Sequence, residues 1–345
     1  MDESVLAPSQ AREYAYQHDG TLRPTARTWI KHFSLLLLTF VTATIAGVLF
    51  PFGWIDTLPA ADPTTWPELL QFILDIPAKY LGLVAAALGS LFTDIRYLKY
   101  GLSFSLSLMF ILISHEMGHY IACRIYRVDA TLPYFIPTPP MIGPAGTFGA
   151  FIKIMSPMPS RRAVFDIGLA GPIAGFIALL PIAVIGIATM ETATPQQVAN
   201  ASGLVFADPL LMKLLGMLLG VDLAFGVPNA FYYAAWVGLL VTALNLIPSG
   251  QLDGGHAIYA VLGKRVHFFT GRIAFVIMTA LSIVGWIYFS SPSGFLIAIL
   301  LGIMTRVRHP EPYDQTPLDT KRKLIAILTL IIFILCFVPF PIKIN

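Results

Sequence analysis

The stretch LSFSLSLMFILISHEMGHYIAC, residues 102–123, decides the fold and holds the most unusual polar residues of the chain. It is long and apolar enough to cross the ~30 Å hydrocarbon core of a membrane as an α-helix. Near its end it reads His115-Glu116-Met117-Gly118-His119. Ionisable side chains are costly to place inside a bilayer, so those found in a membrane span are candidates for function.

The composition of the whole chain agrees with a protein built in a membrane. Of the 345 residues, 56% are hydrophobic and 12% are charged, and the mean hydropathy is +0.74. Because soluble domains carry roughly 25% charged residues, this composition excludes a soluble globular enzyme, a disordered protein and a nucleic-acid-binding protein as leading interpretations. The two cysteines, Cys123 and Cys336, lie far apart in apolar sequence, which excludes a disulfide framework.

The hydropathy pattern predicts an all-α multi-pass membrane protein with about seven transmembrane helices. The expected spans are residues 33–52, 102–123, 163–190, 230–247, 273–289, 295–304 and 324–339. Two apolar segments, residues 80–92 and 295–304, are short for a span, and the count of seven takes 295–304 to cross and 80–92 not to. Residues 203–221 suit an interfacial helix.

The distribution of Lys and Arg predicts the orientation of these spans. With a cytoplasmic N-terminus, 17 of the 22 Lys and Arg residues fall on the cytoplasmic side, as the positive-inside rule requires. The expected organisation is a polar cytoplasmic N-terminus (1–30) followed by a single membrane domain (31–342). No connection reaches the roughly 50 residues that an inserted domain needs. We expect a bacterial inner membrane, or else an organelle membrane.

The connection 131–160 is expected to form a re-entrant or β-like loop. It contains seven prolines, which exclude a long helix, and residues 146–154 between them have the composition of a strand. Two interpretations stay open. The segment is either a plain re-entrant connector or an edge strand that pairs with an extended substrate.

The motif at His115 has the residue types and the spacing of a metal site. Residues i and i+4 share one face of a helix, so His115 and His119 can hold one Zn²⁺. Glu116 then lies next to a ligand and can act as a general base toward water at the metal. With seven His in the chain, the pattern is expected by chance only about 0.002 times, which favours function.

Two histidines do not complete a catalytic zinc site, because a third protein ligand is needed beside a position for water. Asp253 is the best-placed candidate, since Pro248 and Gly250 before it interrupt a helix at the cytoplasmic end of its span. A broken helix at membrane depth is tolerated where it is buried or lines a cavity. Glu191 and Glu311 lie in loop-like sequence and are poorer candidates.

These motifs together resemble the site-2 protease family of intramembrane zinc metalloproteases, which is peptidase M50-like. The matching elements are H-E-x-x-H at 115–119, a glycine motif at 171–175 and N-x-x-P-x-x-x-x-D-G at 245–254. The resemblance covers roughly residues 102–262, the expected catalytic core. Residues 133–175 further resemble the subgroup without a PDZ domain, which includes chloroplast members. Leu252 departs from the family, where many members have proline.

The resemblance implies roles for five residues and an activity. His115, His119 and Asp253 would bind one Zn²⁺ per chain, Glu116 would be the general base, and Asn245 would hold the substrate backbone or the oxyanion. The implied activity is hydrolysis of peptide bonds within or near transmembrane segments of membrane proteins. The expected partners are such a substrate and the lipid bilayer, with no nucleic acid, and the sequence carries no indication of an oligomeric state.

Two other classes of function stay open. A metal-binding membrane transporter would use the same three ligands along a path, although such proteins usually show internal repeats. An inactive protease-like scaffold would have no need of Glu116.

Four smaller features carry their own expectations. His256 is either a spare ligand or orienting residue, or a capping histidine. Cys123 is expected to be a buried apolar side chain. Asp166 is expected to pair with Arg161 or Arg162, or to cap a helix. Small residues at 168–175 are expected to allow close helix packing.

Overall fold

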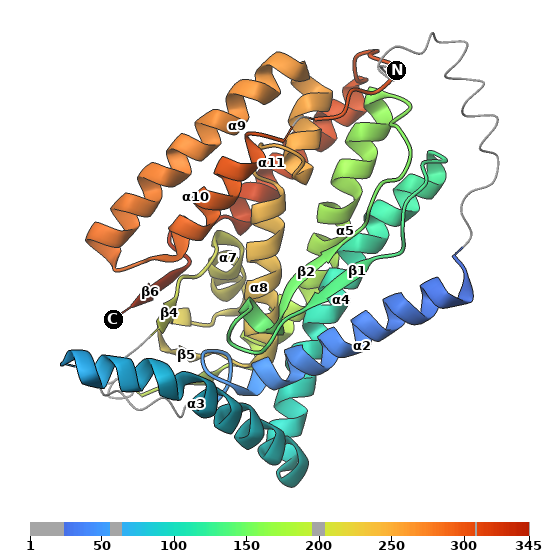
Figure 1. Ribbon diagram of the computed structural model, residues 1–345. Helices are drawn as coiled ribbons and strands as arrows, with labels where there is room; N and C mark the ends of the chain where they lie inside the picture. Colours follow the sequence, from blue (N-terminus) through green and yellow to red (C-terminus); the bar gives the residue numbers. More distant parts are fainter. Residues whose placement is uncertain (1–23, 56–63, 195–203, 308, 345) are drawn as a thin grey trace.

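Six of the nine helices described here begin after a polar N-cap residue whose side chain accepts a main-chain hydrogen bond. The computed structural model describes residues 24–55, 64–194, 204–307 and 309–344, and these are mostly helical (Figure 1). The helices are α2 (Ala26–Val48), α3 (Trp66–Thr93), α4 (Ile95–Ile125), α5 (Arg161–Ala188), α7 (Leu210–Leu219), α8 (Ala230–Asn245), α9 (Asp253–Phe289), α10 (Ser293–Met304) and α11 (Thr320–Cys336). The strands are β1 (Tyr134–Pro137), β2 (Thr147–Phe151), β3 (Glu191–Thr192), β4 (Leu204–Phe206), β5 (Gly226–Val227) and β6 (Ile342–Ile344).

Five of these helices, α2, α3, α4, α5 and α9, are long and apolar enough to cross a membrane. Helices α8, α10 and α11 contain 16, 12 and 17 residues. The mostly helical membrane fold is therefore confirmed, whereas the count of about seven spans stays a prediction. The expected interfacial segment contains α7, a helix of 10 residues.

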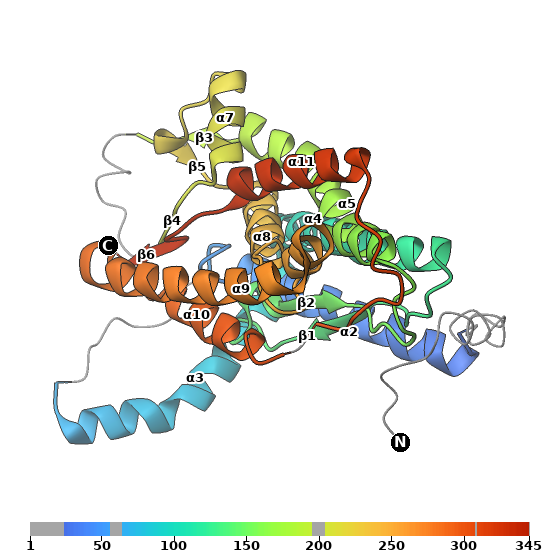
Figure 2. The same cartoon turned by 90° about the horizontal axis from the view of Figure 1, so that it is seen from above.

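Helix α3 departs most from the sequence prediction, because it has 28 residues where hydropathy indicates only 80–92. Asp75, Pro77 and Lys79 interrupt the apolar run in the sequence. In the helix, Asp75 and Lys79 are one turn apart and their charged groups lie 3.9 Å from each other, while Pro77 is accommodated inside the helix. Only one face of α3 is buried, and the helix stands at the edge of the molecule (Figure 2).

Helices α4, α5 and α8 pack against one another and hold the largest hydrophobic core (Figure 1). Small residues allow the close contact between α4 and α5, as the sequence predicts. A Cβ atom at Gly118 of α4 would lie 2.4 Å from the carbonyl oxygen of Ala170 on α5. Since real Cβ atoms never come so close to an oxygen, this position requires glycine.

The predicted break after α8 is confirmed, because α8 ends at Asn245 and α9 begins at Asp253. Gly250 has a positive φ of 55°, which side chains disfavour. A Cβ atom at Gly254 would lie 2.0 Å from the carbonyl oxygen of Leu246. The chain therefore folds back tightly, and the start of α9 is held against the end of α8. Helix α9 is itself kinked at Gly263, where φ is 84°.

Strands β1 and β2 form an antiparallel hairpin in the connection between α4 and α5, with Phe135 opposite Ala150. The strand predicted within 146–154 is thus confirmed as β2. Helix α2 holds the hairpin at two points: His32 Nδ1 donates to the carbonyl of Pro133 at 2.8 Å, and Thr42 Oγ1 to that of Gly146 at 2.8 Å. Two further sheets, β3–β5 and β4–β6, are not predicted by the sequence.

Asp166 at the start of α5 is bound by α11, so the expected pairing with Arg161 or Arg162 is wrong. Arg322 Nε and Nη2 donate to the two carboxylate oxygens of Asp166 at 2.9 and 2.5 Å. Arg161 instead donates to the carbonyl of Ala260, with Nη2 at 2.8 Å from the oxygen. The fold brings in a partner that is distant in the sequence, and this ion pair ties α11 to α5.

We predict that Arg322→Ala lowers the free energy of unfolding by about 1–3 kcal/mol, since it leaves a partly buried carboxylate without its charged partner. Arg96→Ala is the control. It removes a similar pair with Asp94 in which Arg96 is 80% exposed, and it should cost less than about 1 kcal/mol. Both cysteines are buried, so a thiol-reactive dye reports thermal unfolding in detergent. Equal destabilisation by the two substitutions would contradict the prediction.

Candidate metal centre

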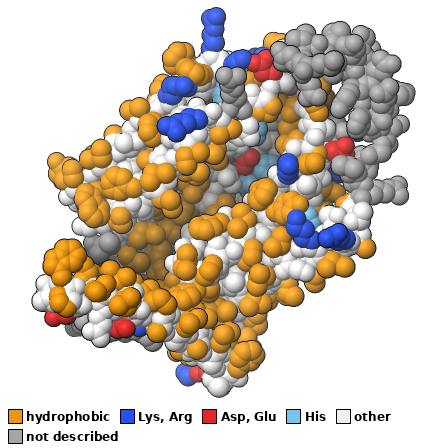
Figure 3. Space-filling view, in the orientation of Figure 1, with side chains coloured by type: hydrophobic (Ala, Val, Ile, Leu, Met, Phe, Trp, Pro, Cys, Tyr) orange, Lys and Arg blue, Asp and Glu red, His pale blue; other side chains and the backbone are white. Residues whose placement is uncertain are grey.

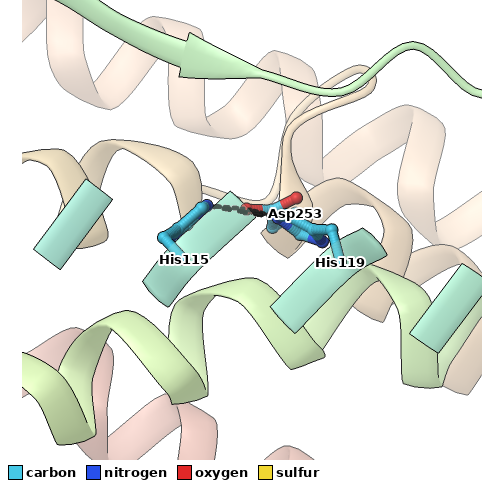
Figure 4. A group of neighbouring side chains, drawn as sticks. All are labelled: His115, His119 and Asp253. Atoms are coloured by element: carbon cyan, nitrogen blue, oxygen red, sulfur yellow. Dashed lines mark hydrogen bonds and ion pairs between the residues drawn. The ribbon is translucent and has the colours of Figure 1, made fainter. Parts of the chain in front are cut away.

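Helix α4 presents His115 and His119 on one face, and the first residue of α9 places Asp253 opposite them. The side chains converge (Figure 4). Both histidines are buried, with 4% and 8% of their surfaces exposed. Their Nε2 atoms are 3.2 Å apart, and each lies 3.4 Å from Oδ2 of Asp253. The structure thus brings together two ligand candidates from one motif and a third that follows more than a hundred residues later.

These separations fit a tetrahedral zinc ion. With bonds of about 2.0–2.2 Å to nitrogen and oxygen, neighbouring ligand atoms of a tetrahedron lie about 3.3–3.6 Å apart, close to the values found here. The ring of His119 is also oriented for metal binding. Its Nδ1 donates to the carbonyl of Ile167 at 2.7 Å, which leaves the lone pair on Nε2. Among the described residues, these three side chains form a group whose ligand atoms all lie within 4.8 Å of one another, close enough to hold one metal ion.

The other two predicted site residues lie beside this group. Glu116 is buried, with 4% of its surface exposed, and interacts with the main chain of Ile152, just after β2. Asn245 is the last residue of α8, and its Nδ2 lies 3.4 Å from Nε2 of His115. All five residues that the sequence singles out are therefore close together.

The five residues line a cavity of about 680 Å³ that opens to the surface. One wall is formed by residues 150–158, at and after the end of β2, and another by residues 251–253 at the start of α9. His256 of α9, Pro310, and Ile167 and Gly168 of α5 also line the cavity. In the space-filling view, acidic and histidine side chains are visible in a recess surrounded by hydrophobic surface (Figure 3). A polar cavity that opens to the surface therefore lies within an otherwise apolar bundle.

The small residues of α5 make room for the two histidines. A Cβ atom at Gly171 would lie 2.1 Å from Nε2 of His119, and one at Gly175 would lie 3.1 Å from Cβ of His115. The glycine motif at 171–175 therefore has a direct steric role, because it forms the surface on which the imidazoles rest.

Sequence reasoning missed His309. Its Nε2 lies 2.6 Å from Nδ1 of His256, which itself stays outside the His115–His119–Asp253 group. His309 follows His256 by 53 residues in loop-like sequence, so no helical spacing connects the two. Cys123 is fully buried in the hydrophobic core, as expected.

We predict that Gly171→Ala lowers the zinc content of the purified protein. The added methyl group would overlap the His119 ring, so the imidazole or α5 must move away from the ligand geometry. Elemental analysis gives zinc per chain. Gly82→Ala is the matched control, because a Cβ atom there meets nothing within 4 Å and zinc should be unchanged. A full zinc complement in Gly171→Ala would refute the steric role.

Comparison with known proteins identifies relatives of the chain. The "probable zinc metalloprotease EGY1, chloroplastic" of Arabidopsis thaliana is 31% identical over 242 residues, which is 66% of this chain and 41% of that protein. The protein of the same name from Oryza sativa subsp. japonica is 30% identical over 236 residues, 65% of this chain and 38% of its own length. The chain thus spans about two fifths of these relatives.

A solved structure, the site-2 protease from Methanocaldococcus jannaschii, aligns with 72% of this chain and 93% of its own length, at 16% identity and a TM-score of 0.33. The model of Peptidase family M50 matches residues 103–285. This stretch contains both ligand-bearing motifs and the glycine motif between them. The resemblance inferred from the motifs is therefore confirmed, and the chain belongs to Peptidase family M50.

Proposed function

We propose that the protein is an intramembrane zinc metalloprotease that hydrolyses peptide bonds within or near transmembrane segments of membrane proteins. The observation that carries this proposal is the convergence of His115, His119 and Asp253 with Glu116 in one cavity of an apolar helical bundle. Membership of Peptidase family M50 and the printed name of the plant relatives support both the reaction and the metal.

His115, His119 and Asp253 would hold one Zn²⁺ per chain. When bound, the metal would lower the pKa of a water molecule and polarise the carbonyl of the scissile peptide. Residues of the chain transfer the protons and stabilise the developing charge. Glu116 accepts the proton of the attacking water and passes it to the leaving amine. Asn245 donates from Nδ2 toward the carbonyl oxygen, where negative charge develops.

The substrate must be unwound before it can be cut, because a helix hides each carbonyl in its hydrogen-bond ladder. The freed N–H and C=O groups need partners at membrane depth. Strand β2 offers such partners, because within the described residues it pairs with β1 along one edge only. Residues 150–154 continue from it along the cavity. The substrate would lie beside β2 as an added strand.

The proposal includes an organisation and a location. Residues 31–342 form one membrane domain with its catalytic core at about 102–262 and about seven spans. The N-terminus is cytoplasmic, and the membrane is the bacterial inner membrane or that of an organelle. The excess of Lys and Arg on one side of the predicted spans supports this orientation.

We predict that Glu116→Gln abolishes cleavage but keeps zinc, because the amide cannot accept a proton while the three ligands stay in place. Asp253→Ala should lose both zinc and activity, because only the two imidazoles then remain. Each variant is purified in detergent, analysed for zinc and incubated with a transmembrane peptide that carries a central helix-breaking residue.

The two readouts separate the assignments. Cleavage by a contamination-free Glu116→Gln sample would exclude Glu116 as the general base. Full zinc in Asp253→Ala would remove Asp253 from the ligand set. If the wild type binds zinc and cuts none of a panel of such peptides, the proposed protease function fails.

We also predict that a cysteine at position 150, in β2, forms a disulfide with a substrate cysteine placed near the cleavage site. Ala150 lines the cavity, and both natural cysteines are buried. The trap uses Ala150→Cys in the Glu116→Gln background so that the substrate stays intact. Phe92→Cys on α3, where Phe92 is 88% exposed, should give no specific adduct. Equal trapping at both positions would argue against binding along β2.

A further inference from the structure

A cluster of three histidines and one tyrosine lies beside the metal-binding group but is not part of it. The rings of His309 and Tyr259 are stacked, with centroids 4.1 Å apart and planes 7° from parallel. His267 packs edge-on against His309 at 5.2 Å, and His256 at 4.7 Å. The His309 ring is therefore enclosed by residues of α9, although it comes from the connection between α10 and α11.

That connection borders the cavity at Pro310. Residues 309–319 form what we call the strap. Its Tyr313 and Asp314 donate main-chain hydrogen bonds to the carbonyls of Met158 and Pro159 at 3.2 and 3.1 Å, and Arg161 N donates back to Asp314 at 2.9 Å. Met158 and Pro310 both line the cavity. The strap is thus fixed at two places, on the chain before α5 and on the first turns of α9.

The hydrogen bonds of the strap determine which nitrogen of each ring carries a proton. His309 Nδ1 lies 2.7 Å from the carbonyl oxygen of Pro310, which can only accept, so Nδ1 is protonated. Burial, with a smaller contribution from nearby His256, lowers the pKa of His309 to about 3, so this ring is neutral and its Nε2 is an acceptor. His256 must then donate from Nδ1 across the 2.6 Å contact. Neutral His256 keeps its lone pair on Nε2.

This lone pair is available to a ligand of the cavity. Within the described residues, Nε2 of His256 makes no hydrogen bond, and His256 lines the same cavity as the five site residues. It lies one helical turn after Asp253. The side chain is also held from behind, because a Cβ atom at Gly168 would lie 2.7 Å from Cβ of His256. A fixed, neutral acceptor beside the site suits a main-chain N–H group.

We propose that His256 is a substrate-binding residue whose Nε2 accepts a hydrogen bond from a main-chain N–H of the unwound substrate, next to the scissile bond. His309 is a positioning residue that holds His256 in the required tautomer and orientation. The inference rests on the proposed proteolysis. It supplies a partner for one of the N–H groups that unwinding frees, each of which is costly to leave unsatisfied in an apolar environment.

Two substitutions at one position separate this role from a purely structural one. His256→Asn keeps an N–H near the place of Nδ1, and so keeps the bond to His309, but removes the acceptor at Nε2. His256→Gln keeps an acceptor near Nε2 and loses the bond to the strap. We expect His256→Asn to lower kcat/KM about 3- to 10-fold, with zinc content and Tm unchanged, and His256→Gln to retain more activity at a lower Tm.

The hydrogen bond is tested directly by changing the substrate. A set of peptides is made in which one amide near the cleavage site is replaced by an ester, which removes a single N–H. For the wild type, one ester position should slow cleavage by the same 3- to 10-fold. For His256→Asn, the ester and the amide at that position should be cut at equal rates.

His309 is tested by its own pair. His309→Gln places an amide oxygen near the position of Nε2, where it can accept the hydrogen bond from His256. This variant should therefore keep a kcat/KM close to that of the wild type. His309→Leu should reproduce the loss seen with His256→Asn and remove the discrimination between ester and amide. Both substitutions remove the stacking on Tyr259, so packing alone would not give the two variants different values of kcat/KM.

The outcomes distinguish this inference from the proposed function. If the wild type cuts the amide peptide and His256→Asn cuts it equally fast, the role of His256 is refuted while the protease function stands. If every ester slows the two enzymes by the same factor, the hydrogen bond is refuted in the same way. If the wild type cuts none of the peptides, both proposals fall together.

Discussion

Ionisable groups inside an apolar bundle must satisfy one another or bind a metal, and most of this structure follows from that constraint. Asp253 is held between two imidazoles at 3.4 Å from each. A buried carboxylate without such partners would be strongly destabilising. Helix α4 supplies both imidazoles, α9 begins at the carboxylate, and α5 forms the surface beneath them. The positions of these three helices are thus coupled through one small polar centre.

The same constraint acts on the backbone around the centre. The break between α8 and α9 exposes main-chain groups that a continuous helix would pair, and at membrane depth they need other partners. His267 Nε2 donates to the carbonyl of Gly250 at 2.9 Å, and glycines at 250 and 254 allow the tight fold-back. The carbonyl of Gly250 therefore has a hydrogen-bond partner, and the break lets both Asn245 and Asp253 line the same cavity.

Under the proposed function, recognition of a substrate in this cavity would depend mainly on the substrate backbone. The hairpin is bound to α2 through His32 and Thr42, and the end of β2 lines the cavity. The strap holds His256, which lines the same cavity. Both features would offer partners to main-chain N–H and C=O groups of the proposed substrate rather than to particular side chains. Such a site would favour segments that unwind easily over segments with a specific sequence.

The sequence alone determined the membrane fold, the helix that bears H-E-x-x-H and the break before Asp253, because each depends on local composition or on spacing within a single turn. The helix break and the family resemblance both indicated Asp253 as the third ligand, but only tertiary structure places it 3.4 Å from both histidines. The contact of His309 with His256 and the pairing of Asp166 with Arg322 could not be predicted from the sequence. Contacts between residues far apart along the chain leave no periodic signal, so only the packing of the helices decided them.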